Sequence, residues 1–204
     1  MKIITIDKND LGENIYIYHD ENNGIIVDPG ACFEEIKQCI SQNNISISAI
    51  LLTHGHFDHI MAASEVRTLT GAPIYCHREE KYMLENSEVN LSIKIGENTT
   101  LTPDKLVEDG QTLNFNGIAL KVIHTPGHTT GGICFYDEKN ANLFTGDTLF
   151  RESIGRTDLP MGNHEELISC IKNKLFTLPD DVTVYPGHGK TSTIKHEKEF
   201  NPFI

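Results

Sequence analysis

The chain has 204 residues, 38% of them hydrophobic and 23% charged, which is ordinary for a globular protein and does not suggest a disordered class. Its formal net charge of −12 argues against nucleic-acid partners, because a grip on phosphate backbones requires clustered Lys and Arg side chains. No apolar run is long enough to span a bilayer, and the N-terminal segment MKIITIDKND lacks the apolar core of a secretory signal. We therefore expect one domain over residues 1–204, a cytoplasmic location and no membrane partner, while the oligomeric state stays open.

The first half of the chain alternates strand and helix patterns. Short β-rich runs predict strands at residues 3–6, 14–19, 24–28, 49–53 and 74–76. Apolar residues at helical spacing predict helices at 33–43 and 60–70, with a small helix near 79–85. The order strand, helix, strand over 49–76 predicts a parallel crossover. No period is evident from 86 to 104, and we expect this long loop to cover the functional site.

The second half continues with strand patterns and then a helix. Strands are predicted at residues 118–124, 132–136, 141–146 and 182–185. The pairs Asp109-Gly110 and Asn116-Gly117 predict hairpin turns. Asn163, with Glu166 three residues later, predicts the N-terminus of a helix. The apolar face of this helix is expected to consist of Leu167, Ile168, Ile171, Leu175 and Phe176.

Side chains that can bind metal ions recur where a predicted strand ends in a glycine-containing turn. This happens four times, at His54, His128, Asp147 and His188. In open α/β architectures, ligands gather in the crevice at the carboxyl ends of strands. We therefore expect these four turns to converge on one site, although they are far apart in the sequence.

The first of these turns, HGHFDH at residues 54–59, is the densest. Two His separated by one residue in an extended segment point the same way, so His54 and His56 can bind one cation together. Asp58 and His59 are adjacent at the start of the next helix and must splay apart, which suits them to a second cation. A single tetrahedral zinc is saturated by four ligands, so this cluster argues for two metal ions.

Four motifs resemble, in order and spacing, those of the metallo-β-lactamase superfamily: HGHFDH (54–59), HTPGHT (124–129), TGDTLF (145–150) and PGHG (186–189). Within this superfamily, LFRESIGRTDLP (149–160) and the closing NPFI are similar to the short glyoxalase II-like, or hydroxyacylglutathione hydrolase-like, branch. The resemblance spans nearly the whole chain. It implies an α/β fold in the form of a four-layer αββα sandwich.

The resemblance also implies roles for single residues. The expected ligands are His54, His56 and His128 for the first metal, Asp58, His59 and His188 for the second, and Asp147 as a bridge between both. Zinc is the expected metal, with iron or manganese as alternatives. Asp28 resembles a position that orients a ligating His. Arg156 resembles the basic residue that contacts glutathione. The alternative interpretation is that Arg156 forms a surface ion pair with Asp158 or Glu152.

The remaining histidines fall outside the ligand pattern. We expect His19, His77, His164 and His196 at the surface or at helix caps. For His124, which precedes Thr125-Pro126-Gly127, a supporting role behind a ligand and a purely structural role both stay open.

Two divalent cations lower the pKa of a water molecule between them, so the predicted mechanism uses a bridging hydroxide and no protein nucleophile. A GxSxG motif is absent, and the five scattered cysteines stand outside the motif turns. Asp58 or Asp147 would handle the proton. A thiolate leaves without a dedicated general acid, which favours a small-molecule thioester such as a hydroxyacylglutathione as substrate.

One alternative chemistry is a persulfide dioxygenase with a single iron, which His54, His128 and Asp147 could hold as two His and one carboxylate. Hydrolysis of β-lactams is disfavoured, because many true β-lactamases of the superfamily have a Cys where Asp147 stands. A ribonuclease-like role is opposed by the negative charge. A metal-binding role without catalysis is the weakest alternative, since every expected ligand is present.

Overall fold

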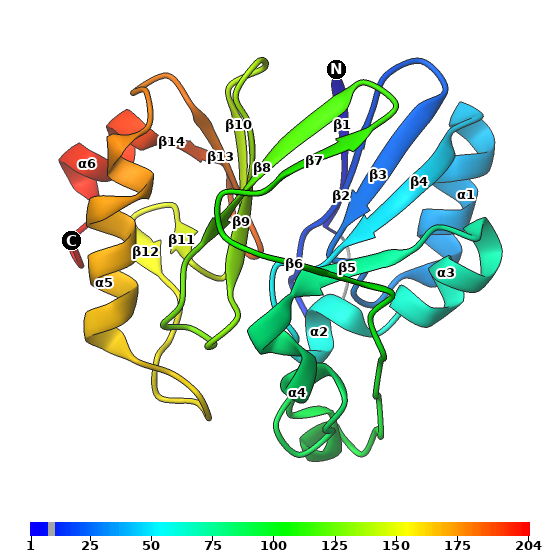
Figure 1. Cartoon of the computed structure of the whole chain (residues 1–204), viewed down its shortest axis with the longest axis horizontal. Coiled ribbons are helices and arrows are strands. Elements are labelled where there is room, and N and C mark those ends of the chain that lie inside the picture. Colours follow the sequence, from blue (N-terminus) through cyan, green and yellow to red (C-terminus); the bar gives the residue numbers. More distant parts are fainter. Residues whose placement is uncertain (8–10) are drawn as a thin grey trace.

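Two six-stranded β-sheets pack face to face, and helices cover the outer face of each sheet (Figure 1). The computed structural model describes residues 1–7 and 11–204. The order of layers is helices, sheet, sheet, helices, so the predicted αββα sandwich is confirmed. None of the helices in the described part of the chain is long and apolar enough to cross a membrane.

The first sheet contains the strands of the N-terminal half in sequence order. Its strands are β1 (Lys2–Ile6), β2 (Ile15–His19), β3 (Asn23–Val27), β4 (Ser46–Leu51), β5 (Ile74–His77) and β6 (Lys105–Val107). The first three strands are antiparallel, while β3, β4, β5 and β6 pair in parallel, so the predicted crossover is confirmed. The helices of this half are α1 (Phe33–Asn43), α2 (Phe57–Ile60), α3 (Ala63–Thr70) and α4 (Lys81–Leu84), with 3-10 turns η1 (Arg78–Glu80) and η2 (Ser92–Ile95).

The second sheet has the strand order β14-β13-β10-β9-β8-β7. Its strands are β7 (Thr112–Phe115), β8 (Ile118–His124), β9 (Ile133–Asp137), β10 (Asn142–Gly146), β13 (Thr183–Pro186) and β14 (Ser192–Thr193). A separate small ribbon is formed by β11 (Leu149–Phe150) and β12 (Ser153–Ile154). The outer face is covered by α5 (His164–Asn173), η3 (Leu175–Thr177) and α6 (Ile194–Phe200) (Figure 1).

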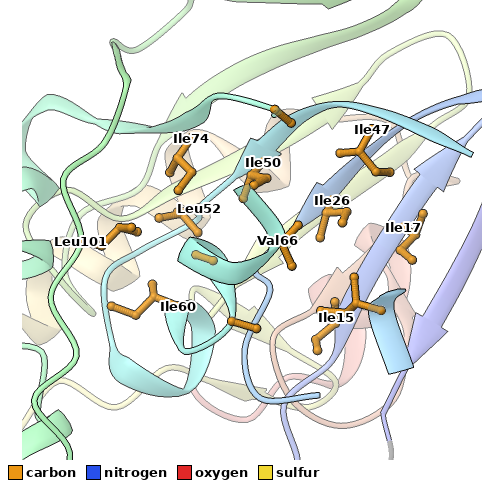
Figure 2. Packing of buried hydrophobic residues seen from close by; sticks show 14 of the residues in the cluster. Ile15, Ile17, Ile26, Ile47, Ile50, Leu52, Ile60, Val66, Ile74 and Leu101 are labelled. Carbon is orange, nitrogen blue, oxygen red and sulfur yellow. The ribbon is translucent and has the colours of Figure 1, made fainter. Parts of the chain in front are cut away.

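The core has three layers because the central strands are apolar on both faces. In β3, Ile25 and Val27 face the second sheet, whereas Ile26 between them packs toward the helices. Figure 2 shows Ile26 and Ile50 around Val66 of α3, in the layer between the first sheet and its helices. Each such fully buried side chain stabilises the fold by about 1.5–3 kcal/mol relative to an exposed one. The core therefore fixes the strands whose ends carry the candidate ligands.

Several predicted elements differ from the observed ones. The predicted helix at 60–70 corresponds to α3, which begins at Ala63, after the separate short helix α2 has ended at Ile60. The Asp109-Gly110 turn is not a hairpin, because the strands on either side, β6 and β7, belong to different sheets. Asn116-Gly117 does connect a hairpin, β7 to β8, and both residues have positive φ, at 51° and 100°. This turn type favours Asn followed by Gly.

The helix predicted from Asn163 is confirmed. The side chain of Asn163 accepts a hydrogen bond from the backbone N–H of Glu166 at 3.2 Å, as expected of an N-cap. The ribbon of β11 and β12 and the C-terminal helix α6 were not predicted from the sequence. Strands of two residues are too short to show an alternating pattern, and α6 is a short helix rich in charged residues.

Candidate metal centre

All seven predicted ligands lie together where the two sheets meet, in loops that follow strands. His54 and His56 follow β4, and Asp58 and His59 belong to α2 directly after them. The other three follow strands of the second sheet: His128 comes after β8, Asp147 after β10 and His188 after β13. The carboxyl ends of four strands therefore deliver the site, as the sequence predicts.

The first group, which we call the three-histidine set, consists of His54, His56 and His128. One nitrogen from each ring lies within 4.8 Å of the others. The closest pair is His56 Nδ1 and His128 Nε2, which are 2.9 Å apart. All three side chains are buried, with at most 4% of their surface exposed. Their convergent nitrogens form a small, buried site of imidazole donors.

The second group, which we call the carboxylate-containing set, consists of Asp58, His59 and His188, and its ligand atoms also lie within 4.8 Å of one another. Asp58 Oδ2 is 3.3 Å from His188 Nε2 and 3.8 Å from His59 Nε2. This set is more open, since the side chain of His188 is 30% exposed.

Asp147 lies between the two sets. Its Oδ2 is 3.5 Å from His128 Nε2 of the three-histidine set. Its Oδ1 is 3.4 Å from His59 Nε2 and 3.7 Å from His188 Nε2 of the other set. Each carboxylate oxygen of Asp147 thus faces a different set, which is the arrangement that a bridging ligand requires.

Buried polar atoms without partners indicate what this constellation fits. Among the described residues, the Nε2 atoms of His54, His56 and His59 and the Oδ1 atom of Asp147 are buried and make no hydrogen bond. An unsatisfied buried polar atom costs about 1–3 kcal/mol, and four in one spot are exceptional. Imidazole nitrogens and carboxylate oxygens are ligands of divalent transition metals. The donor set therefore fits two such cations.

The ring nitrogens that face away from the site are held by hydrogen bonds. His59 Nδ1 lies 3.0 Å from Asp28 Oδ2, His128 Nδ1 lies 2.7 Å from the carbonyl oxygen of Arg156, and His188 Nδ1 lies 3.0 Å from the carbonyl oxygen of Gly12. An Nδ1–H that donates to oxygen leaves the Nε2 lone pair free for a metal. These contacts preset three of the five histidines for binding.

Asp28 supports the site as predicted. Besides His59, its carboxylate accepts hydrogen bonds from the backbone N–H of Thr53 at 2.7 Å and from the Thr53 hydroxyl at 2.6 Å. Thr53 directly precedes His54, so Asp28 contacts both the first motif loop and a histidine of α2. Its backbone has a positive φ of 48°, which is uncommon for a residue other than glycine.

Gly187 of the PGHG motif allows the last loop to approach the others. A Cβ at this position would lie 2.3 Å from Asp147 Oδ1 and 2.6 Å from His59 Cε1. Only glycine fits between these two side chains, so the motif glycine is required by close packing rather than by backbone flexibility.

The electrostatics of the two sets differ. Burial lowers the pKa of His54 well below its usual value and lowers the pKa of His56 to about 3, with neighbouring histidines adding to the effect. Burial acts in the same direction on His59, but Asp147 and Asp58 outweigh it and raise the pKa of His59 well above its usual value. His188 shows the same balance, with a hydrogen bond to Asp58 raising its pKa.

A cavity of about 560 Å³ opens above the two sets. Besides five of the candidate ligands, it is lined by the apolar side chains of Phe57, Leu91, Phe150, Ile154 and Leu159 and by the cations Lys94 and Arg156. Leu91 and Lys94 belong to the loop at 86–104, so this loop reaches the site as predicted. The cavity therefore has a polar floor and mainly apolar walls.

Arg156 is both a cavity residue and an ion-pair partner. Its guanidinium donates to both carboxylate oxygens of Asp158, at 2.7 and 2.8 Å, and its side chain is 62% exposed. The predicted surface ion pair is therefore present, with Asp158 and not with Glu152. The contact of its carbonyl oxygen with His128 could not be expected from the sequence, because motif patterns describe side chains.

The other histidines were expected at the surface or at helix caps, but His19 is instead buried at the end of β2, while His77 is buried and forms a cap. Each is only 5% exposed. His77 does cap η1 as expected, since it accepts a hydrogen bond from the backbone N–H of Glu79. Its ring stacks on His124, with centroids 4.0 Å apart and an angle of 17° between the planes.

Together with Glu79, the stacked pair has candidate ligand atoms within 4.8 Å of one another, but its geometry favours a structural role. His124 Nε2 lies 2.9 Å from the carbonyl oxygen of Thr130, so this nitrogen is already engaged. Lone pairs lie in the ring plane, and those of two nearly parallel rings do not converge on one ion. The outer histidines match the prediction better: His164 is exposed at the start of α5, and His196 pairs with Glu152 at 2.8 Å.

The sequence is similar to those of known proteins. A family model described as the metallo-beta-lactamase superfamily matches residues 9–188. The chain is 40% identical over 211 residues to a probable metallo-hydrolase of Streptococcus pyogenes, a match that covers 100% of this chain and 90% of the relative. It is 38% identical over 191 residues to the hydroxyacylglutathione hydrolase GloC of Haemophilus influenzae, a match that covers 92% of this chain and 90% of the relative.

Several solved structures have the same fold. BLEG-1, described as a B3 metallo-beta-lactamase, superposes with a TM-score of 0.95 at 38% identity, covering 99% of both chains. TTHA1623 in a di-iron-bound form gives a TM-score of 0.88 at 32% identity, covering 100% of both chains. ETHE1 from Myxococcus xanthus gives 0.82 at 26% identity, covering 99% of this chain and 84% of that one. From its fold, its clustered His and Asp side chains and these relatives, the chain belongs to the metallo-β-lactamase superfamily.

Proposed function

We propose that this chain is a metal-dependent hydrolase that cleaves a small-molecule thioester, such as a hydroxyacylglutathione. The observation that carries the proposal is the pair of ligand sets joined by the Asp147 carboxylate at the floor of an open cavity. Bound divalent cations would supply Lewis acidity and a water molecule with a pKa near neutrality. The similarity to a hydroxyacylglutathione hydrolase supports the same substrate class.

The side chains of the chain supply position and proton handling. Asp147 offers one oxygen to each set and thereby fixes the spacing between them. Asp58 lines the cavity, and although burial works to raise its pKa, His59 and His188 keep that pKa below its usual value. Asp58 therefore stays ionised at neutral pH and can accept a proton at Oδ2.

The cavity offers no hydroxyl or thiol nucleophile. Its described lining residues include neither Ser nor Cys. Three of the five cysteines are buried in the core, and burial raises the thiol pKa of Cys76 and Cys134 to about 12. A direct attack by water on the substrate carbonyl fits this composition. Among acyl substrates, a thioester needs the least help from a general acid, because a thiolate has a pKa near 8.5.

The cations at the cavity point to an acidic carrier group on the substrate. Arg156 and Lys94 line the cavity together with Asp58 and Asp147 of its floor, so two cations stand among the otherwise apolar walls, where an acidic group of a substrate can meet them. The apolar side chains of Phe150 and Leu159 suit the acyl or thiol part. We propose that Arg156 contacts the acidic part of the carrier, with its Asp158 partner holding the guanidinium in place.

Two other activities serve as alternatives in the test. A persulfide dioxygenase with one iron would use His54, His128 and Asp147, but it gives no role to the fully assembled carboxylate-containing set. β-Lactam hydrolysis enters because BLEG-1 is described as a B3 metallo-beta-lactamase. Both alternatives stay within the same superfamily.

The experiment measures metal content and substrate choice on one preparation. The full chain is purified without chelators, and bound metals are counted by plasma mass spectrometry. It is then assayed with S-D-lactoylglutathione, with glutathione persulfide under oxygen monitoring, and with a chromogenic cephalosporin. Two metal equivalents with release of thiol would support the proposal. One iron equivalent with oxygen uptake, or cleavage of the cephalosporin alone, would replace it.

A further inference from the structure

Glu80 is a fully buried carboxylate that belongs to neither ligand set. It ends η1, directly after β5, and none of its surface is exposed. Burial raises the pKa of Glu80 to about 7, even though hydrogen bonds to its carboxylate act in the opposite direction. A buried carboxylate is unfavourable unless its oxygens are satisfied by donors. The identity of these donors indicates what Glu80 does.

The two oxygens of Glu80 bind two different ligand loops. Oε1 accepts a hydrogen bond from the backbone N–H of Gly55 at 2.8 Å. Oε2 accepts one from the backbone N–H of Gly131 at 2.8 Å and one from the Thr129 hydroxyl at 3.1 Å. Gly55 lies between His54 and His56, whereas Thr129 directly follows His128. One carboxylate therefore joins the two loops that carry the whole three-histidine set.

Close packing enforces this connection. A Cβ at Gly131 would lie 2.3 Å from the backbone nitrogen of Glu80 and 2.5 Å from its Oε2. A Cβ at Gly55 would lie 3.0 Å from Met83 Cγ and 3.4 Å from Glu80 Oε1. The loop of Gly131 thus approaches η1 as closely as a glycine backbone allows, and the loop of Gly55 packs tightly against side chains of α4. A side chain at Gly131 would push its loop away from Glu80.

We propose that Glu80 is a positioning residue for the three-histidine set, because its carboxylate fixes the distance between the loop of His54 and His56 and the loop of His128. The inference rests on the proposed function, since it assumes that these histidines bind a metal ion. Glu80 is assigned to the three-histidine set only, because none of the hydrogen bonds of Glu80 reaches Asp58, His59 or His188. Asp28 holds His59 by direct contact, whereas Glu80 acts through the backbone.

Replacement of Glu80 by Gln separates positioning from simple filling of space. Gln has almost the same shape, but it offers one acceptor oxygen and one NH₂ donor in place of two acceptor oxygens. Whichever way the amide turns, its NH₂ group faces the backbone N–H of either Gly55 or Gly131. One ligand loop must then lose its hydrogen bond and shift, because two donors cannot pair.

The test is a double-mutant cycle. For each variant, the metal-free protein is prepared, and its affinity for zinc is measured by competition with a chromophoric chelator. His188→Ala disables the carboxylate-containing set and leaves the three-histidine set as the zinc site. His128→Ala does the reverse. We expect E80Q to weaken zinc binding about 10-fold or more in the His188→Ala background, as partners behind metal ligands typically do. In the His128→Ala background we expect less than a 2-fold change.

Equal weakening in both backgrounds, or none in either, would overturn the inference. If zinc binds to neither single variant nor to the unmodified chain, the proposed metal site itself fails, and this outcome is distinct from a failure of the Glu80 assignment. Urea denaturation of each metal-free variant records the stability separately from the affinity. Asp137→Asn is the matched control, because Asp137 is another buried carboxylate that accepts hydrogen bonds, from Tyr18 and Asn140, in a different part of the fold.

Thr129→Val keeps the inference testable if E80Q does not fold. It removes one donor to Oε2 and preserves the carboxylate and its charge. We expect a weakening of zinc binding in the His188→Ala background that is smaller than that of E80Q, about 3-fold, and in the same direction. Equal weakening of zinc binding by Thr129→Val in the His188→Ala and His128→Ala backgrounds, or no weakening in either, would overturn the inference in this test as well.

Discussion

The three-histidine set and the carboxylate-containing set lie side by side but are built differently. The first consists of histidine rings from two loops, is almost completely buried, and is held from behind by backbone contacts. The second includes Asp58, is partly open to solvent at His188, and is held by the carboxylate of Asp28. Burial and nearby charge can therefore set the affinity and the protonation of two adjacent cation sites separately.

The two sets also differ in the protonation of their histidine side chains. In the three-histidine set, burial without a dedicated carboxylate keeps His54 and His56 neutral far below pH 7. In the other set, nearby carboxylates favour the protonated rings of His59 and His188. A cation entering the first set meets free lone pairs, whereas a cation entering the second must displace protons. We therefore expect the carboxylate-containing set to lose its metal first as the pH falls.

The largest effect is expected when the residue shared by both sets is changed. Asp147→Ala removes an oxygen from each set at once. Mutation of a residue that hydrogen-bonds to a metal ligand typically lowers activity by up to about 100-fold, so we expect the loss of this shared ligand to lower activity by more than that. Metal content should fall while the circular dichroism spectrum stays that of the unmodified protein. Asp180→Ala, which changes an exposed carboxylate outside both sets and outside the cavity, is the control. Full activity in Asp147→Ala would contradict the site as described.

The two sets can be emptied one at a time. His128→Ala should reduce the metal content by one equivalent, and His188→Ala should do the same at the other set, with plasma mass spectrometry as the measurement. In both variants we expect activity to fall by at least about 10-fold. Because His188 is partly exposed, its removal should perturb stability less than removal of buried His128. Loss of both metals from either variant would show that the sets do not bind independently.

The proton contrast predicts opposite effects on the stability of the metal-free protein. The pKa of His56 is about 3 in the folded state and near 6.5 in the unfolded state, so its contribution is present above pH 6.5 and is lost as the pH falls toward 3. The pKa of His59 is raised by folding, so its contribution is present below pH 6.5 and is lost as the pH rises through the folded value.

Urea denaturation in the presence of a chelator, from pH 4.5 to pH 8, tests this prediction. Relative to His56→Gln, the unmodified protein should lose stability below pH 6.5, by an amount on the order of a few kcal/mol. Relative to His59→Gln, it should gain stability as the pH is lowered toward 6.5. If the stability difference from the unmodified protein depends on pH in the same way for both variants, the two sets share one electrostatic environment.

The sequence indicates the ligands well because they are local patterns. HGHFDH places four of them in six residues, and the other three each follow a strand that can be read from its apolar run. The layers of the fold follow in the same way from strands such as β3, which is apolar on both faces. What the motifs indicate is therefore the set of side chains and the strands that carry them.

The contacts behind the ligands are less accessible from the sequence. Glu80 stands in a short stretch of charged residues, and only the folded chain brings it against Gly55 and Gly131, which are 25 and 51 residues away. The carbonyl oxygens of Gly12 and Arg156 carry no sequence signal at all, because every residue has one. Asp109-Gly110 fails as a hairpin for a similar reason: a turn signal does not say which sheet the next strand joins.

The smallest effect is expected at Arg156, where the side chain and the backbone have separate tasks. Arg156→Ala removes the exposed guanidinium at the cavity but leaves the carbonyl oxygen that holds His128. We expect KM for an acidic thioester to rise about 3- to 10-fold, the loss of one exposed charge contact, with kcat and metal content unchanged. An uncharged thioester should show no change in KM. Loss of metal from Arg156→Ala would instead show that its side chain keeps the loop in place, and would make this loop part of the support of the three-histidine set.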